Sequence, residues 1–333
     1  MFDAVCFGEV LWDFFERPPT GSARGGNPVG CDYRRELGGT SANTATGLAR
    51  LGVRVALVGG VGRDRFGDAL VLHLARDGVD VRFAQRLAHR TGLTFVTRGV
   101  DGEPTFVPYR KDAADGAIRA GHLTAAMGRA RWVVVGSGTL ATDGLAEATA
   151  RLLRLAAAAG AYVLFDLNVR PHLWSSRPAM RRAIAGLAAR AAVVKASDAD
   201  LRALSPRGSG YGWLERHAPQ AVWLVTRGAD RASAVGKHGE VALAARRGRC
   251  VDATGGGDAF VAGSLAALVA ADAAPGSSAW ADGALWTSVL RIGHMMGMKA
   301  VSRTGAVAGI ERLHRIRAAL DGVRHSYSGR TFA

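Results

Sequence analysis

Short apolar runs alternate with Ala/Leu/Arg-rich stretches along most of the chain, and this alternation constrains the fold more than any other feature. The apolar runs are β-rich and bounded by Gly or polar residues, which is typical of buried strands. They cover residues 55–58, 132–135, 162–165, 192–194 and 222–225. The stretches at residues 142–160, 178–191 and 258–271 have helical spacing. Strand alternating with helix predicts an α/β fold with a mostly parallel sheet covered on both faces.

Two segments interrupt this rhythm, at residues about 14–36 and about 93–112. Residues 94–97 and 105–109 have the pattern of a hairpin. A small β-sheet standing off the main domain is therefore expected, and it could act as a lid over a cleft. The chain length suits one domain over residues 1–325 with the lid segments inserted, and the polar residues 326–333 are expected to form a flexible tail.

The net charge is +15, from 43 Lys and Arg against 28 Asp and Glu. Nearly all the positive charge is Arg scattered among the helices, without a basic block or interleaved aromatic residues, so no nucleic-acid partner is predicted. No run approaches the ~18 apolar residues of a membrane span. The N-terminus also lacks a basic start before its apolar stretch. These features predict a cytoplasmic protein without a membrane partner.

The strongest motif for function is the run Asp-Ala-Thr-Gly-Gly-Gly-Asp at residues 252–258, which opens a predicted helix. The start of a helix favours an anion, and glycines let a phosphate approach the backbone closely. The amides of Gly255, Gly256 and Gly257 are candidates for an anion hole, and Asp258 is a candidate general base beside it. The alternative is a loop that ends in a helix cap. The residue order differs from both the Walker and the dinucleotide-binding patterns.

Residues 252–258 resemble the C-terminal signature Asp-Thr-x-Gly-Ala-Gly-Asp of the ribokinase-type carbohydrate kinases, the PfkB family. The chain departs from it at Ala253 and Gly256. The resemblance implies a ribokinase-like three-layer αβα sandwich with a central, mostly parallel sheet and a small β-sheet lid. It also implies an ATP-dependent kinase for a primary hydroxyl of a small carbohydrate, with Asp258 as the base and with Mg²⁺ as a cofactor.

Residues 38–45, followed by Gly52 and Gly62, resemble the N-terminal signature of the same family. Residues 7–13 resemble its first strand, whose closing Asp hydrogen-bonds two sugar hydroxyls. The residues that contact the sugar by this resemblance are Gly38, Gly39, Asn43 and Asp13. Taken alone, Asn43 would be a helix cap and Asp13 a turn residue.

The nucleotide side has weaker motifs, at residues 195–200 and 226–228. They resemble the family's Asn/Ser-x-x-Glu and Thr-x-Gly elements. The resemblance implies that Ser197, Thr226 and Gly228 lie at the nucleotide, and that Asp200 reaches Mg²⁺ through water. Asp200 stands where Glu is usual, so its carboxylate is shorter. Family members often bind K⁺, and the matching region here is Asp252 with Thr254 and the backbone at 302–305; a helix cap, a strand-end turn and a loop are the alternatives.

Residues 101–110 and 165–174 resemble fructokinases and 2-keto-3-deoxygluconate kinases. The resemblance implies that Arg110 and Arg170 reach the acceptor, although each could be a surface Arg. Among the possible acceptors we favour fructose. The alternatives are 2-keto-3-deoxygluconate, aminoimidazole riboside, a nucleoside, or a catalytically silent sugar-sensing relative, which the presence of Asp258 disfavours. The exposed edge of the small lid gives it a reason to pair with a second lid in a homodimer.

Overall fold

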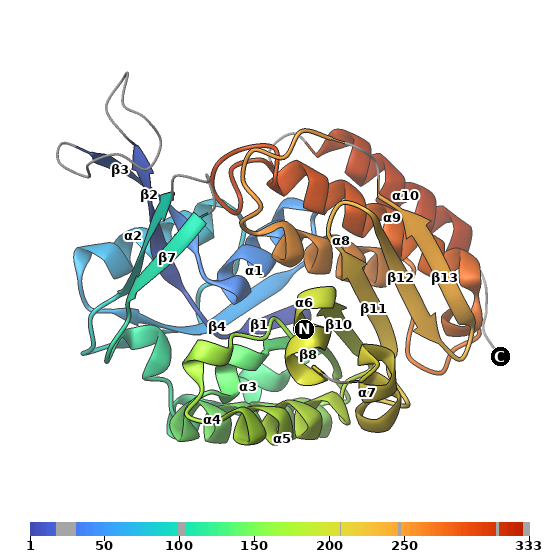
Figure 1. Cartoon of the computed structure of the whole chain (residues 1–333), viewed down its shortest axis with the longest axis horizontal. Coiled ribbons are helices and arrows are strands. Elements are labelled where there is room, and N and C mark those ends of the chain that lie inside the picture. Colours follow the sequence, from blue (N-terminus) through green and yellow to red (C-terminus); the bar gives the residue numbers. More distant parts are fainter. Residues whose placement is uncertain (18–30, 99–103, 207, 246–247, 311–312, 329–333) are drawn as a thin grey trace.

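The computed structural model describes residues 1–17, 31–98, 104–206, 208–245, 248–310 and 313–328. Within them a nine-stranded sheet forms the centre of the molecule (Figure 1). In spatial order its strands are β13 (Gly239–Ala244), β12 (Arg231–Gly236), β11 (Val222–Arg227), β10 (Val193–Ser197), β9 (Tyr162–Asp166), β8 (Ala130–Gly136), β1 (Phe2–Phe7), β4 (Val55–Gly62) and β5 (Ala84–Leu87). All five apolar runs identified in the sequence lie in or overlap these strands.

The sheet is parallel from β11 to β5, and β12 runs antiparallel to both of its neighbours, β11 and β13. The predicted mostly parallel sheet is therefore confirmed. From β1 the chain builds outward to β4 and β5, and then returns to β8 on the other side of β1. Ligands of open parallel sheets bind at the carboxyl ends of the strands where the order reverses, which here is between β1 and β8.

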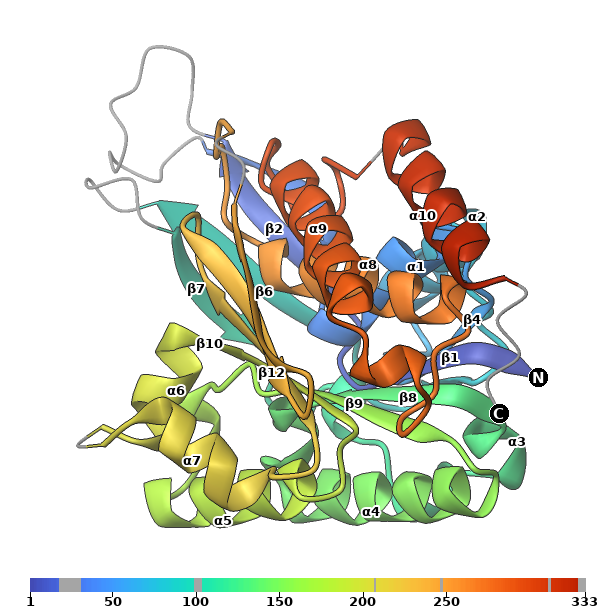
Figure 2. The same cartoon turned by 90° about the vertical axis from the view of Figure 1, so that its right-hand side faces the viewer.

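Helices cover both faces of this sheet, as the turned view shows (Figure 2). One layer contains α1 (Thr40–Arg50), α2 (Arg65–Arg76), α8 (Gly256–Ala270), α9 (Gly283–Ala300) and α10 (His314–Tyr327). The other contains α3 (Ala125–Gly128), α4 (Asp143–Ala158), α5 (Arg177–Ala188), α6 (Asp198–Leu204) and α7 (Gly210–His217). Short 3₁₀ helices, η1 (Ala114–Gly116), η2 (Ala120–His122), η3 (Ser137–Leu140), η4 (Pro171–Leu173) and η5 (Ala279–Ala281), occur in the connections. The sandwich has a separate hydrophobic core on each face of the sheet.

A four-stranded sheet stands off this body. Its strands, in spatial order, are β3 (Asp32–Gly38), β2 (Leu11–Arg17), β6 (Gly92–Arg98) and β7 (Pro104–Tyr109). The predicted hairpin is confirmed, because β6 and β7 pair antiparallel. We call this sheet the lid. It begins at Leu11, earlier than predicted, and residues 18–30 and 99–103 of the predicted lid lie outside the described residues.

Two boundaries differ from expectation. The prediction of a first strand that closes at Asp13 was wrong, since β1 ends at Phe7 and Asp13 lies in β2 of the lid. The break occurs at Gly8, whose φ is 144° and where a Cβ would lie 2.5 Å from Ser41 Oγ. The expected tail begins inside α10, which runs to Tyr327, and residues 329–333 lie outside the described part. The division into one domain stays a prediction. No helix in the described ranges is long and apolar enough to cross a bilayer.

Candidate active site

The glycine turn before α8 brings Asp258 to the middle of the molecule. Gly255 caps the helix in the left-handed region, at φ 75°, and a Cβ there would lie 2.5–2.7 Å from atoms of Ala306. Only glycine adopts this conformation without strain and without that collision. The helix that follows is apolar on all sides and is almost wholly buried, so it fixes Asp258 firmly in the first turn.

Backbone amides of this turn are free to bind an anion. Gly256 N donates to Ala253 O at 3.3 Å and Ala259 N donates to Gly255 O at 2.9 Å. For the N–H groups of Gly257 and Asp258, the described residues provide no acceptor. Of the three amides predicted for the anion hole, that of Gly256 is already bonded, whereas those of Gly255 and Gly257 have no acceptor among the described residues. The N–H of Asp258 is a further free donor in the same turn.

Asn43 holds the carboxylate of Asp258. Its Nδ2 donates to Asp258 Oδ2 at 2.8 Å, across the contact between α1 and α8. Burial raises the pKa of Asp258 to about 6, while the hydrogen bond from Asn43 acts in the opposite direction. Asn43 Oδ1 is buried and has no hydrogen-bond partner among the described residues. This oxygen remains available to accept a hydrogen bond from a ligand hydroxyl.

Asp13 lies against the glycines that open α1. A Cβ on Gly38 would lie 2.5 Å from Asp13 Oδ2, and one on Gly39, whose φ is 94°, would lie 2.5 Å from Glu9 O. Burial raises the pKa of Asp13 to about 7. The positive charge of Arg110 opposes this shift, whereas the negative charges of Glu9 and Asp258 add to it. Residues predicted to contact a sugar from two separate motifs are thus brought together around the candidate base.

Arg110 enters the same region from the end of β7. It ion-pairs with Glu9 at 3.0 Å, and its Nε donates to Asp115 Oδ2 at 3.0 Å. Burial alone would lower the pKa of Arg110, but Glu9 and Asp115 outweigh this effect and raise it. Arg110 was predicted from the sequence to reach the acceptor, but its two carboxylate partners were not. Asp115, five residues after Arg110, was given no role from the sequence.

Arg170 is exposed, and within the described structure its side chain forms no hydrogen bond or ion pair with the other predicted residues. Its charge nevertheless acts on the pKa of Asp258, which places it near the site. Asn168, two residues earlier, was missed. Its backbone has φ 31°, and its Nδ2 donates to Thr40 Oγ1 at 2.8 Å. This bond connects the carboxyl end of β9 to the first turn of α1, and strained backbone of this kind is common at functional sites.

On the nucleotide side, Ser197 and Thr226 are register partners at the carboxyl ends of β10 and β11, and Gly228 follows in an open turn with φ 53°. Asp200 is buried, and its oxygens accept three hydrogen bonds of 2.7 Å, from Val169 N, Ser197 N and Ser197 Oγ. These bonds do not fit a direct metal ligand. The described residues contain no cluster of three or more His, Cys, Asp or Glu that would hold a metal.

The residues predicted for K⁺ do lie together. Asp252 Oδ1 accepts from Thr254 N at 3.0 Å and from Thr254 Oγ1 at 2.7 Å, while Oδ2 accepts from Gly305 N at 3.0 Å. A carboxylate has about four acceptor positions, so one more contact on Oδ2 is possible. The K⁺ assignment of Asp252 and Thr254 stays a prediction.

A buried cation, Lys195 on β10, was quoted within the sequence motif but given no role. It pairs with Asp166, which is also buried and which ends β9.

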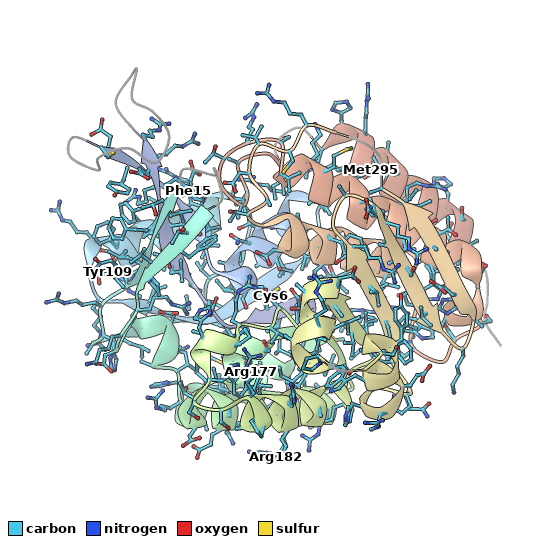
Figure 3. All side chains as sticks on the ribbon, viewed as in Figure 1. Cys6, Phe15, Tyr109, Arg177, Arg182 and Met295 are labelled. Carbon is cyan, nitrogen blue, oxygen red and sulfur yellow. The ribbon has the colours of Figure 1, made fainter. Side chains whose placement is uncertain are left out.

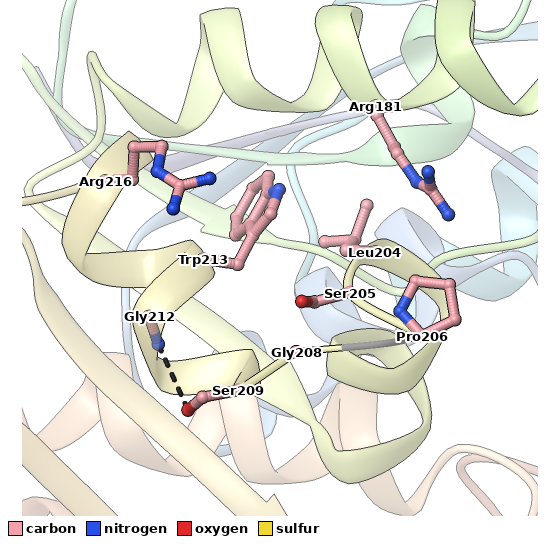
Figure 4. A pocket seen from close by; sticks show the side chains of 9 residues that line it. All are labelled: Arg181, Leu204, Ser205, Pro206, Gly208, Ser209, Gly212, Trp213 and Arg216. Carbon is pink, nitrogen blue, oxygen red and sulfur yellow. Dashed lines mark hydrogen bonds between the residues drawn. The ribbon is translucent and has the colours of Figure 1, made fainter.

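A separate hollow of about 770 Å³ lies among α5, α6 and α7 (Figure 4). It is lined by Arg181, Leu204, Ser205, Pro206, Gly208, Ser209, Gly212, Trp213 and Arg216, none of which belongs to the site around Asp258.

Comparison with known proteins points to one family. The model of the pfkB family carbohydrate kinases matches residues 1–313. A probable fructokinase-3 of Arabidopsis thaliana is 31% identical over 319 residues, which cover 92% of this chain and 88% of that protein. The fructokinase of Xylella fastidiosa, solved with bound ATP, superposes with a TM-score of 0.83 at 30% identity over 97% of this chain and 99% of that one.

A second solved structure is a double mutant of the fructokinase of Vibrio cholerae O395 with fructose, ADP and potassium ion bound. It superposes with a TM-score of 0.81 at 25% identity, and the match covers 96% of this chain and 98% of that one. These neighbours confirm the ribokinase-like fold that the signature motifs implied.

Proposed function

Since the chain belongs to the pfkB family of carbohydrate kinases, we propose that it transfers the terminal phosphate of ATP to a primary hydroxyl of fructose. The observation that carries the proposal is the arrangement at the start of α8. Asp258 is buried, and its Oδ2 accepts a hydrogen bond of 2.8 Å from Asn43 Nδ2. The carboxylate lies beside two free backbone N–H groups, those of Gly257 and of Asp258 itself. The similarity to fructokinases supports fructose as the acceptor.

In this mechanism Asp258 accepts the proton of the attacking hydroxyl. Asn43 holds Oδ2 at 2.8 Å and so leaves Oδ1 of the base for the substrate. The amides of Gly257 and Asp258 then stabilise the charge on the phosphoryl oxygens during in-line transfer. Asp13, Gly38 and Gly39, with Asn43 Oδ1, hold the other hydroxyls and fix the orientation of the acceptor.

The charges at the sugar end favour a neutral acceptor. Four carboxyl groups lie in this region, those of Glu9, Asp13, Asp115 and Asp258. Arg110 contacts two of them, Glu9 and Asp115, and the charge of Arg170 acts on Asp258. A sugar acid would add another negative charge to a region where carboxyl groups outnumber guanidinium groups, which is unfavourable in a buried site. These charges support fructose over 2-keto-3-deoxygluconate, a choice for which the sequence offered no physical reason.

The first test is ATP-dependent phosphorylation of fructose, 2-keto-3-deoxygluconate, ribose, aminoimidazole riboside and adenosine. We expect kcat/KM for fructose to exceed that for 2-keto-3-deoxygluconate by at least about tenfold, the effect of about 1.4 kcal/mol of repulsion. Preference for the sugar acid would contradict the charge argument. Turnover of no acceptor, with fructose still bound in a calorimeter, would favour the silent sugar-sensing alternative.

For the ions, we propose that Mg²⁺ accompanies the ATP phosphates and reaches Asp200 only through water, since the chain itself occupies the Asp200 oxygens at 2.7 Å. When bound, Mg²⁺ neutralises phosphate charge. K⁺ would lie at Asp252 and Thr254, beside the signature turn. Ser197, Thr226 and Gly228 are proposed to contact the phosphates, and Arg170 is proposed to reach the acceptor. The need for ATP supports a cytoplasmic location.

We also propose a homodimer formed through the lid. Exposed apolar side chains gather on its edge strands, with exposed fractions of 39% for Tyr33, 50% for Phe106, 40% for Val107 and 65% for Tyr109. Tyr109 lies on the far side of the molecule from Met295 of α9 (Figure 3). Edge strands with apolar side chains favour pairing with another chain.

Phe106→Asp should convert the dimer to a monomer, because it places a charge within the apolar contact. Light scattering coupled to gel filtration measures the mass. The matched control is Leu72→Asp on α2, since Leu72 is 51% exposed but lies outside the lid. A wild-type protein with the mass of one chain at all concentrations would refute the dimer.

A further inference from the structure

Lys195 and Asp166 form a buried ion pair beneath the glycine turn. They are register partners on the neighbouring strands β10 and β9, which brings both side chains to the carboxyl end of the sheet. Lys195 Nζ lies 3.1 Å from Asp166 Oδ1, and the two side chains are 6% and 3% exposed. Neither residue has a role in the mechanism described above.

The ammonium of Lys195 also lies directly against the candidate anion hole. A Cβ built on Gly257 would lie 3.1 Å from Lys195 Nζ, so the glycine leaves room for the charged group at this point. Gly257 itself is exposed, whereas Lys195 is buried. A cation and two free backbone amides, those of Gly257 and Asp258, therefore lie together at the edge of the site.

Stability does not explain the pair well. Removing two charges from water costs several kcal/mol per ion, and a buried pair is often no more stable than apolar residues of the same volume. Of the carboxylates in the described ranges, Asp166 alone is within ion-pair distance of Lys195. An ammonium has three N–H donors. Burial alone would lower the pKa of Lys195, but the charges of Asp166, Asp200 and Asp258 outweigh it and raise that pKa, so the cation persists at neutral pH.

We propose that Lys195 is a catalytic residue that binds the terminal phosphoryl group of the donor nucleotide before and during transfer, and that Asp166 is the positioning residue that holds its ammonium. This inference rests on the proposed kinase function. The transferred group spreads negative charge over its three equatorial oxygens. A preorganised cation in a site that excludes water stabilises such charge more strongly than a solvated one.

The direct test is the pair of variants Lys195→Met and Lys195→Met with Asp166→Asn. We expect both to lower kcat for fructose about 100- to 1000-fold, the usual effect of losing a group that stabilises transition-state charge. KM for fructose should change less than threefold. The double variant leaves no unpaired buried charge, so its thermal midpoint should stay near that of the wild type. Wild-type activity in the double variant would overturn the proposal, because a purely structural pair is dispensable when removed whole.

A second measurement does not depend on turnover. Calorimetry compares the affinity for ADP with that for the non-hydrolysable analogue AMP-PNP, which carries a terminal phosphoryl group. Lys195→Met should weaken AMP-PNP at least tenfold and ADP less than threefold. An equal loss for both nucleotides, or no loss for either, would overturn the role of Lys195 even if no acceptor is phosphorylated. Failure of the proposed function itself would instead show as wild-type inactivity with this nucleotide difference intact.

The positioning role of Asp166 is tested by the same difference between the affinities for AMP-PNP and ADP. Asp166→Asn should narrow the gap between AMP-PNP and ADP affinity and lower kcat about tenfold, since the ammonium remains but loses its anchor. Lys195→Arg keeps the charge and should retain more kcat than Lys195→Met. If Asp166→Asn weakens both nucleotides alike, Asp166 supports the fold and does not position the cation.

Discussion

Asp258→Asn should lower kcat for fructose by about 100- to 10,000-fold, the range that general-base catalysis contributes. Asparagine has nearly the same shape but cannot accept the proton. Fructose affinity should survive, because Asp13, Gly38 and Gly39 are unchanged. The matched control is Asp143→Asn, since Asp143 also lies in the first turn of a helix but is exposed. Retention of more than about a tenth of kcat would exclude Asp258 as the base.

The same substitution should stabilise the protein above pH 6. Burial raises the pKa of Asp258 from 3.8 to about 6, so the folded state binds this proton more tightly than the unfolded state does. The stability from this group is complete below pH 4 and is lost as the pH rises through 6. At pH 8, Asp258→Asn should gain up to about 3 kcal/mol of unfolding free energy. Urea unfolding at pH 4 and pH 8 measures this gain, which should vanish at the lower pH.

Catalysis should show the complementary pH dependence. Because the base works only as the carboxylate, kcat/KM for fructose should fall as the pH is lowered through about 6, the pKa of Asp258. For the stability experiment described above, the same unfolding free energy in Asp258→Asn and in the wild type at pH 8 would mean that the Asp258 carboxylate is not desolvated. A function-related residue that costs stability is the expected sign of an active site.

Gly255→Ala has the second large expected effect. The new Cβ would meet the Ala306 backbone at 2.6–2.7 Å, and φ is 75°. Backbone atoms cannot rotate away as a flexible side chain can, so the turn or the Ala306 loop must shift. Overpacking costs about 1–3 kcal/mol, and the left-handed conformation adds about 1–2 kcal/mol. We expect a loss of about 2–5 kcal/mol of unfolding free energy and, because the anion-hole amides move, a fall in kcat of at least about 100-fold.

Gly160→Ala is the matched control for Gly255→Ala. Gly160 has φ 72°, but a Cβ there would meet nothing within 4 Å. It should therefore show only the conformational cost of about 1–2 kcal/mol and keep full activity. Urea unfolding and steady-state kinetics of both variants provide the comparison. Equal losses of stability, with kcat unchanged in Gly255→Ala, would show that the collision at Ala306 is relieved without moving the anion hole.

The layers of the fold were predictable because local patterns report burial. The apolar run at residues 162–165 lies in β9, and the helical spacing at 142–160 corresponds to α4 (Asp143–Ala158). The same patterns do not mark where a strand leaves one sheet for another. Residues 7–13 were treated as one strand, whereas Gly8 breaks the chain and sends Asp13 into the lid. The glycine is the one local sign of this break, and the close approach of Ser41, where a Cβ on Gly8 would lie 2.5 Å from Oγ, is visible only in the structure.

The site was predictable where its chemistry is contiguous in sequence. Asp258 and its glycines form one motif, and Asn43 belongs to another. Asn43 was predicted to contact the sugar alone, whereas in the structure its Nδ2 also lies 2.8 Å from Asp258 Oδ2. That bond joins residues 215 positions apart, so only packing of α1 against α8 could reveal it.

By itself the sequence determined the family, the α/β order of elements and the candidate base, because these depend on residue type, periodicity and short motifs. Tertiary structure alone decided which charges meet. Arg110 lies between Glu9 and Asp115, and Lys195 pairs with Asp166 against Gly257. The physical reason is that the energy of a charge depends on its burial and its neighbours, which parallel strands and the lid bring together from distant parts of the chain.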